Sequence, residues 1–255
     1  MQMKGSVTPW LVPLGSSPRA RLRLFCFPYA GGGAHIFHQW PRRLPDVEVY
    51  AVQPPGRGVR MSERPLTSLG ELVAAAAPAL LPFMDRPFAF YGHSMGALLG
   101  YELARRLREE GRPEPSYLFV SGCRAPQSAD ARDVTYDLPD AEFVEVLRRL
   151  KGTPAEVLEH EELLRLLLPL LRADFAVTQT YRYSEGPPLG CPITAVGGLQ
   201  DEEVTREHLP PWREMTTGAF SLHMLPGDHF FLHTSQDMLL EIINRQLARL
   251  RDGAA

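Results

Sequence analysis

The chain has 255 residues, of which 44% are hydrophobic and 22% are charged, and its formal net charge is −3. This composition is that of a soluble globular protein, and the length suits a single α/β domain with an insertion. The small negative charge excludes the basic surface that nucleic acids or anionic membranes require.

Short apolar segments alternate with helical patterns along the chain. This alternation predicts a mostly parallel sheet that is covered by helices on both faces. A short strand near residues 10–14 is expected at the sheet edge. Further strands are expected at residues 23–29, 47–53, 88–91, 116–122, 191–197 and 220–225, and helices at 69–83, 97–110, 208–215 and 235–250.

Residues 126–188 interrupt this alternation because no strand pattern occurs there. Residues 139–151 and 161–183 instead carry apolar side chains at helical spacing, and Pro169 is expected to kink or restart the second helix. We interpret the segment as a helical lid over the carboxyl ends of the strands, inserted into a core of residues 1–125 and 189–255. The alternative is a helical subdomain that only covers the core.

The three cysteines, Cys26, Cys123 and Cys191, form no C-x-x-C pair. Cys26 and Cys123 lie in apolar strand patterns, where a thiol is usually a small buried hydrophobe. The N-terminus lacks the apolar core of a signal peptide, and no segment approaches the roughly 18 apolar residues of a membrane helix. The sequence therefore predicts a cytoplasmic protein without a membrane segment.

The most informative motif is Gly92-His93-Ser94-Met95-Gly96, which follows a predicted strand and precedes a predicted helix. A serine between two glycines at such a turn is typical of a nucleophile elbow, because a side chain at either glycine would collide as the chain reverses. The turn lifts the serine hydroxyl off the sheet. We therefore predict Ser94 as a nucleophile.

A serine nucleophile needs a base, and the base needs a carboxylate that holds its tautomer. Asp201 and His229 follow the predicted strands at 191–197 and 220–225, in the order Ser, acid, His. Asp228 would have to fold back on its own neighbour, and Asp174 in the lid is otherwise a surface charge or a lid anchor. The other histidines have competing interpretations: His93 as buried support, His35 and His38 near the pocket or on the surface, His223 in a strand, and His233 in a weak metal pattern with no further ligand.

Two backbone N–H groups are needed to stabilise an oxyanion. The N–H of Met95 lies at the start of the helix after the nucleophile. The second is expected from Ala30, in a glycine-rich loop that continues Gly31-Gly32-Gly33 after the predicted strand at 23–29. The alternative interpretation of that loop is a flexible turn.

Taken together, these motifs resemble the type II (external, editing) thioesterases of polyketide and nonribosomal peptide synthesis, over residues 22–250. The matching stretches are FCFPYAGG at 25–32, QPPGR at 53–57, YGHSMGA at 91–97, LRADF at 171–175 and GDHFF at 227–231. The resemblance implies an α/β-hydrolase fold with a helical lid and a Ser94, Asp201 and His229 triad. It also implies a monomer that acts transiently on acyl or peptidyl carrier proteins. No cofactor or metal is implied, because the phosphopantetheine arm enters with the substrate.

Several apolar residues are candidates for an acyl chamber beneath the lid, or alternatively pack the lid on the core. Lid motion is expected to gate this chamber. Four arginines, at 42, 43, 57 and 60, either meet an acidic carrier protein or form a solvated face, and we favour the solvated face. The chamber candidates are Tyr29, Leu147, Leu150, Leu166, Leu167 and Phe175.

Three other functions remain open at this stage. The residues alone support a serine acyl hydrolase, which includes lipases and general carboxylesterases. A product-releasing thioesterase or acyltransferase is closer, but a chain of this length without carrier sequence favours editing. A hydrolase fold that serves as a binding module is disfavoured because all three triad candidates are present.

Overall fold

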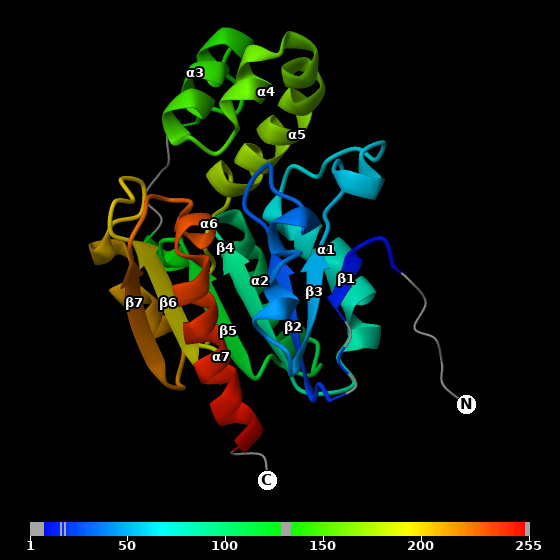
Figure 1. Cartoon of the computed structure of the whole chain (residues 1–255), viewed down its shortest axis with the longest axis vertical. Coiled ribbons are helices and arrows are strands. Elements are labelled where there is room, and N and C mark those ends of the chain that lie inside the picture. Colours follow the sequence, from blue (N-terminus) through cyan, green and yellow to red (C-terminus); the bar gives the residue numbers. More distant parts are fainter. Residues whose placement is uncertain (1–7, 16, 18, 129–133, 253–255) are drawn as a thin grey trace.

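The computed structural model describes residues 8–15, 17, 19–128 and 134–252. Its strands form one seven-stranded sheet in the order β1-β3-β2-β4-β5-β6-β7 (Figure 1). β1 pairs antiparallel with β3 at the edge, as expected, and the other strands are parallel. The strands are β1 (Leu11–Gly15), β2 (Leu22–Phe27), β3 (Val47–Val52), β4 (Phe88–His93), β5 (Tyr117–Ser121), β6 (Ile193–Gly198) and β7 (Phe220–Leu225).

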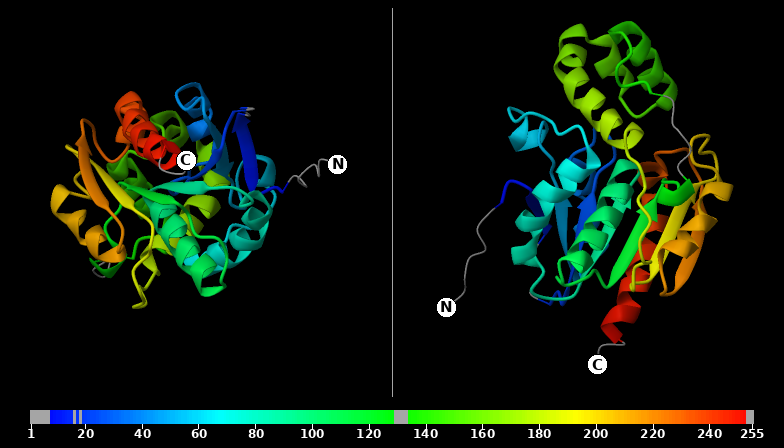
Figure 2. Two further views of the ribbon diagram at one scale, coloured as in Figure 1. Left: turned by 90° about the horizontal axis from the view of Figure 1, so that it is seen from below. Right: turned by 180° about the vertical axis from the view of Figure 1, so that it is seen from behind.

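Helices cover both faces of the sheet (Figure 2). Helices α1 (Leu69–Leu80) and α2 (Met95–Glu109) pack on one face, and α7 (Gln236–Asp252) packs on the other. Strand β2 shows why both faces are covered. Phe25 and Phe27 enter the core beneath α1 and α2, whereas Leu24 and Cys26 enter the core beneath α7. A strand that is apolar on both sides is typical of a parallel sheet. The predicted fold class is confirmed.

Some predicted helices differ from the observed elements. The helix expected at 208–215 is replaced by two 3₁₀ segments, Arg206–His208 and Pro210–Met215. Pro210 and Pro211 lack backbone N–H groups, and this favours short turns over a regular α-helix. The four-residue helix α6 (Phe231–Thr234) was not predicted, because its single turn is too short to show a periodic pattern.

In the described residues between β5 and β6, three α-helices stand above the carboxyl ends of the strands (Figure 1). This helical insertion consists of α3 (Asp140–Leu150), α4 (Ala155–Glu159) and α5 (Glu161–Gln179). It has a small core of its own that includes Phe143 and Leu168. Helix α5 continues across Pro169, so the predicted restart does not occur there. Residues 129–133 of the predicted lid lie outside the described residues.

All three cysteines, Cys26, Cys123 and Cys191, are buried. In the described part of the chain, every helix is too short or too polar to cross a lipid bilayer.

Candidate active site

The nucleophile candidate Ser94 occupies the turn between β4 and α2. Its backbone has φ 53° and ψ −117°, a conformation that a residue with a side chain rarely adopts. The Ser94 N–H donates a hydrogen bond of 2.8 Å to the carbonyl oxygen of Ser121 on β5. This bond anchors the turn to the sheet, and the strained geometry is that of a nucleophile elbow.

The two glycines of the motif allow the start of α2 to approach the sheet closely. A Cβ atom on Gly92 would lie 2.1 Å from the carbonyl oxygen of Gly96. A Cβ atom on Gly96 would lie 2.1 Å from the carbonyl oxygen of Phe27 at the end of β2. Both clashes are with backbone atoms, so neither can be relieved by a side-chain rotation.

The substitution Gly96→Ala is therefore expected to destabilise the protein by about 3 kcal/mol or more, the range for severe overpacking. Urea unfolding followed by circular dichroism measures this effect. Gly70→Ala in α1 is the matched control, because nothing lies within 4 Å of a Cβ atom there. The control is expected to gain about 0.5–1 kcal/mol from the lower entropy of its unfolded chain. Equal, small effects of both substitutions would contradict the close approach at Gly96.

Asp201 and His229 come together at the carboxyl ends of β6 and β7. The Nδ1 atom of His229 lies 2.8 Å from Oδ2 of Asp201. The other carboxylate oxygen accepts the backbone N–H groups of Glu203 and Val204, both at 2.9 Å. A carboxylate in this position holds the Nδ1–H tautomer of the imidazole and leaves Nε2 available as a base.

The electrostatic environment keeps Asp201 ionised. Burial by itself raises the pKa of this carboxyl group. The hydrogen bonds from His229 and from the backbone N–H groups of Val204 and Glu203 outweigh burial, so the pKa of Asp201 is lowered overall. An anionic Asp201 is the form that stabilises a protonated His229.

Ser94, His229 and Ala30 line one pocket of about 400 Å³ between the sheet and the helical insertion. This volume lies in the range of ligand pockets. The insertion contributes side chains from α3 and α5 to its wall. Of the predicted chamber residues, the pocket is lined by Tyr29, Leu147, Leu150 and Phe175.

The other two predicted chamber residues lie outside this pocket. Leu167 is partly buried against the core of the helical insertion, and Leu166 is 57% exposed. Leu171, one helical turn further along α5, lines the pocket instead. Helical periodicity identified the apolar face of α5, but the pocket lies toward its C-terminal half.

His93 is the buried support that the sequence predicts. It is fully buried, its Nδ1 atom lies 3.0 Å from Oγ of Ser121, and its ring meets that of His229 with centroids 5.2 Å apart. Burial and the neighbouring His229 lower the pKa of His93, which therefore stays neutral. A neutral ring beneath His229 supports that side chain and places no second positive charge beside it.

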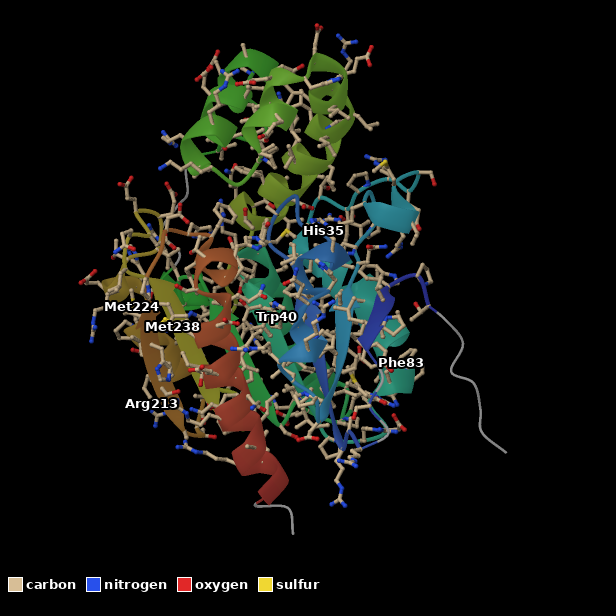
Figure 3. The ribbon with its side chains drawn as sticks, viewed as in Figure 1. His35, Trp40, Phe83, Arg213, Met224 and Met238 are labelled. Carbon is tan, nitrogen blue, oxygen red and sulfur yellow. The ribbon has the colours of Figure 1, made fainter. Side chains whose placement is uncertain are left out.

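The remaining histidines have separate environments. His35 lies in a short 3₁₀ helix, Ala34–Phe37, beneath the helical insertion (Figure 3), but it is exposed and does not line the pocket. His38 is exposed as well. His233 pairs with the hydroxyl group of Tyr29 at 3.0 Å.

The described residues contain no cluster of His, Cys, Asp and Glu that could hold a metal ion.

The two rival acids have other partners. The carboxylate of Asp228 accepts the N–H of Phe230, its near neighbour in sequence. Asp174 is 1% exposed and forms an ion pair with Arg57. Asp174 is thus an anchor and not a surface charge. The interpretation of a solvated arginine face is wrong for Arg57 and Arg60, which are buried.

Sequence reasoning missed that Arg57 contacts the predicted oxyanion loop, where its guanidinium group donates to the carbonyl oxygen of Gly32 at 3.0 Å. The available signal was position: Arg57 follows β3, whose neighbour β2 leads directly into the predicted oxyanion loop.

The predicted oxyanion donors are the backbone N–H groups of Ala30 and Met95. Met95 is the first residue of α2, so its N–H lies at the positive end of the helix. Ala30 lies in a turn closed by a hydrogen bond of 2.9 Å from the Gly32 N–H to the Tyr29 carbonyl oxygen. Among the described residues, neither the Ala30 N–H nor the Met95 N–H has a hydrogen-bond acceptor. Both groups are available to a ligand.

A parallel sheet with helices on both faces, an elbow serine, and a carboxylate–histidine pair on the last two strand ends define the α/β-hydrolase class. Within this class the chain belongs to the thioesterase domain family, whose profile matches residues 22–247. The family expected from the sequence motifs is confirmed.

Individual relatives extend this finding. The chain is 47% identical over 250 residues to linear gramicidin dehydrogenase LgrE of Brevibacillus parabrevis, covering 96% of this chain and 95% of the relative. It is 38% identical over 237 residues to thioesterase PikA5 of Streptomyces venezuelae, covering 92% of this chain and 83% of the relative. The solved structure of the type II thioesterase BorB from the borrelidin biosynthetic cluster is 40% identical, with a TM-score of 0.85 over 93% of this chain and 97% of BorB.

LgrE is named as a dehydrogenase. In contrast, the matching family is that of the thioesterase domain, and PikA5 and BorB are both named as thioesterases. His229 is hydrogen-bonded to Asp201 and lines one pocket with the elbow serine, and this arrangement agrees with the thioesterases. The chain is accordingly a thioesterase.

Proposed function

We propose that this thioesterase edits biosynthetic assembly lines. It removes stalled or aberrant acyl groups from the phosphopantetheine arms of carrier proteins in polyketide or nonribosomal peptide synthesis. The main evidence for this chemistry is that His229 and Ser94 line the same pocket and that Nδ1 of His229 lies 2.8 Å from Asp201. The pathway is supported by the names of two relatives: LgrE is named for linear gramicidin, and BorB for the borrelidin biosynthetic cluster. The partners are transiently bound carrier proteins, and the enzyme acts as a cytoplasmic monomer.

The proposed reaction proceeds through an acyl-enzyme. Oγ of Ser94 attacks the thioester carbonyl carbon while Nε2 of His229 takes the hydroxyl proton. The N–H groups of Ala30 and Met95 hold the oxyanion. The carbon–sulfur bond then breaks, and His229 returns the proton to the departing pantetheine thiol.

Hydrolysis of the acyl-serine repeats the sequence with water. His229 takes a proton from water as its oxygen attacks the ester carbonyl, and it protonates Ser94 as the carboxylic acid leaves. Asp201 remains ionised throughout and stabilises the imidazolium form. The side chains of Leu147 and Phe175 provide an apolar wall of the pocket for the acyl group. The helical insertion acts as a lid above this group.

The choice between a carrier-protein thioesterase and a general carboxylesterase is tested by substrate comparison. Release of free acid is measured for one acyl group presented as acyl carrier protein, as acyl-pantetheine and as an ethyl ester. We expect kcat/KM for the carrier-bound thioester to exceed that for the ester by at least about 100-fold, or roughly 3 kcal/mol of transition-state stabilisation. An ester turned over as fast as the carrier-bound thioester would contradict the proposal. Repeating the assay with different acyl groups on one carrier protein defines the acyl preference.

A further inference from the structure

The loop that carries Ala30 is a tight turn of defined geometry. The Gly32 N–H donates to the Tyr29 carbonyl oxygen at 2.9 Å, and Gly31 at the third position has φ +77°. A positive φ at this position is the signature of a type II turn, in which the central peptide is flipped relative to a type I turn. The central peptide joins Ala30 to Gly31. The Ala30 N–H belongs to the preceding peptide, between Tyr29 and Ala30, so contacts that hold the turn in place also fix the position of this N–H.

A carboxylate from the helical insertion holds this central peptide. Oδ2 of Asp174, on α5, accepts the Gly31 N–H at 2.7 Å. The turn also packs on α5, because a Cβ atom on Gly31 would lie 2.7 Å from Cδ2 of Leu171. The conformation of the turn therefore depends on a helix about 140 residues away in sequence.

A buried arginine completes the contact. The guanidinium group of Arg57 donates to both oxygens of Asp174, from Nη1 to Oδ2 at 2.8 Å and from Nη2 to Oδ1 at 2.7 Å. The same Nη1 atom donates to the carbonyl oxygen of Gly32 at 3.0 Å. The pair thus binds one N–H and one carbonyl oxygen of the turn. Its Arg57 and Asp174 side chains are 6% and 1% exposed.

Stability alone is a weak reason for such a pair. The loss of hydration of two buried charges offsets much of their mutual attraction, and apolar residues of similar volume often stabilise a protein equally well. An apolar pair could not accept the Gly31 N–H or bind the Gly32 carbonyl oxygen. What the charges add is orientation of the turn next to Ser94.

We propose that Arg57 and Asp174 are positioning residues that hold the Ala30 N–H in place for the oxyanion. This inference rests on the proposed function, because it concerns the oxyanion site of that reaction. The pair touches no reacting atom and acts through the turn. Because Asp174 belongs to α5, the helical insertion contributes to the oxyanion site as well as to the pocket wall.

The first test is Asp174→Asn, assayed with acyl-pantetheine. Complete removal of an oxyanion donor typically costs about 10²–10³ in kcat. Displacement of the donor is expected to lower kcat by about 10–100-fold, with KM changed less than about threefold. Asp140→Asn is the matched control, since the exposed Asp140 on α3 forms an ion pair with Arg172, which lies on α5 like Asp174. The control is expected to retain wild-type kcat. An Asp174→Asn enzyme with wild-type kcat would overturn the proposal.

Two further variants separate positioning from stability. Arg57→Lys keeps the buried charge but loses the planar group that reaches both Asp174 oxygens and Gly32. It is expected to lower kcat about tenfold with little change in Tm. In the double variant Arg57→Met/Asp174→Leu, we expect Tm to recover toward the wild-type value while kcat stays low. Recovery of both Tm and kcat in the double variant would show a merely structural pair and overturn the inference.

The outcomes distinguish this inference from the proposed function. If the proposed function fails, the wild-type enzyme itself does not hydrolyse acyl-pantetheine. If only the positioning role fails, the wild-type enzyme is active and the Arg57 and Asp174 variants match its kcat.

Discussion

Ser94→Ala is expected to lower kcat for acyl-pantetheine hydrolysis by roughly 10⁵–10⁶-fold, the scale found when a triad nucleophile is removed. The alanine variant retains the pocket and the backbone N–H of Met95 but cannot form the acyl-enzyme. Its Tm is expected to stay within a few degrees of the wild-type value, because the partly exposed hydroxyl group makes no hydrogen bond within the described residues. Steady-state kinetics and thermal melting of the same preparation check both statements.

Ser184→Ala provides the matched control, because Ser184 is exposed and lies outside the active-site pocket. A fluorophosphonate probe should label the wild-type protein and the control but not the Ser94→Ala variant. Residual turnover above about 1% of the wild-type rate in Ser94→Ala would refute the nucleophile assignment. Labelling at another residue would do the same.

The second large effect is expected at the base. His229→Ala should lower kcat about as much as loss of the nucleophile, because the two side chains act as one unit. For the same reason, the double variant Ser94→Ala/His229→Ala should be no slower than either single variant. Asp201→Asn should lower kcat by about 10⁴-fold, since the amide favours the wrong tautomer of His229.

His38→Ala is the control for these variants, because His38 is exposed and does not line the pocket. Additive losses in the Ser94 and His229 double variant would contradict a shared proton transfer. Near-normal activity of Asp201→Asn would show that the 2.8 Å contact with His229 does not orient the base. These variants and Ser94→Ala are compared by initial rates at saturating acyl-pantetheine.

Much of the fold was predictable because local residue patterns mark the strands and because several neighbouring strands follow one another along the chain. The strand at Phe220–Leu225 is predicted with its observed bounds, and the other strands differ by a few residues at their ends. The last four parallel strands in the sheet follow chain order. The loops after β6 and β7 therefore lie side by side, which brings Asp201 and His229 together. Residue type at strand ends was sufficient for this part of the site.

The helical insertion was less predictable. Periodicity identified α3 and α5. It did not distinguish Leu167, which packs against the core of the insertion but does not line the pocket, from Leu171, which belongs to that core and lines the pocket. Both are leucines on the apolar side of one helix. Their roles depend on where α5 crosses the sheet, and no local pattern contains that information.

The sequence by itself determined the chemistry of the elbow, because such a tight turn requires Gly92 and Gly96. A Cβ atom at either position would lie only 2.1 Å from a backbone oxygen atom. The alternation of strands and helices likewise determined the parallel sheet. Only the tertiary structure decided that Arg57 and Asp174, 117 residues apart, are buried against each other beneath the turn that carries Ala30. Charged residues are usually exposed, so their burial follows from partners that meet only when distant segments pack together.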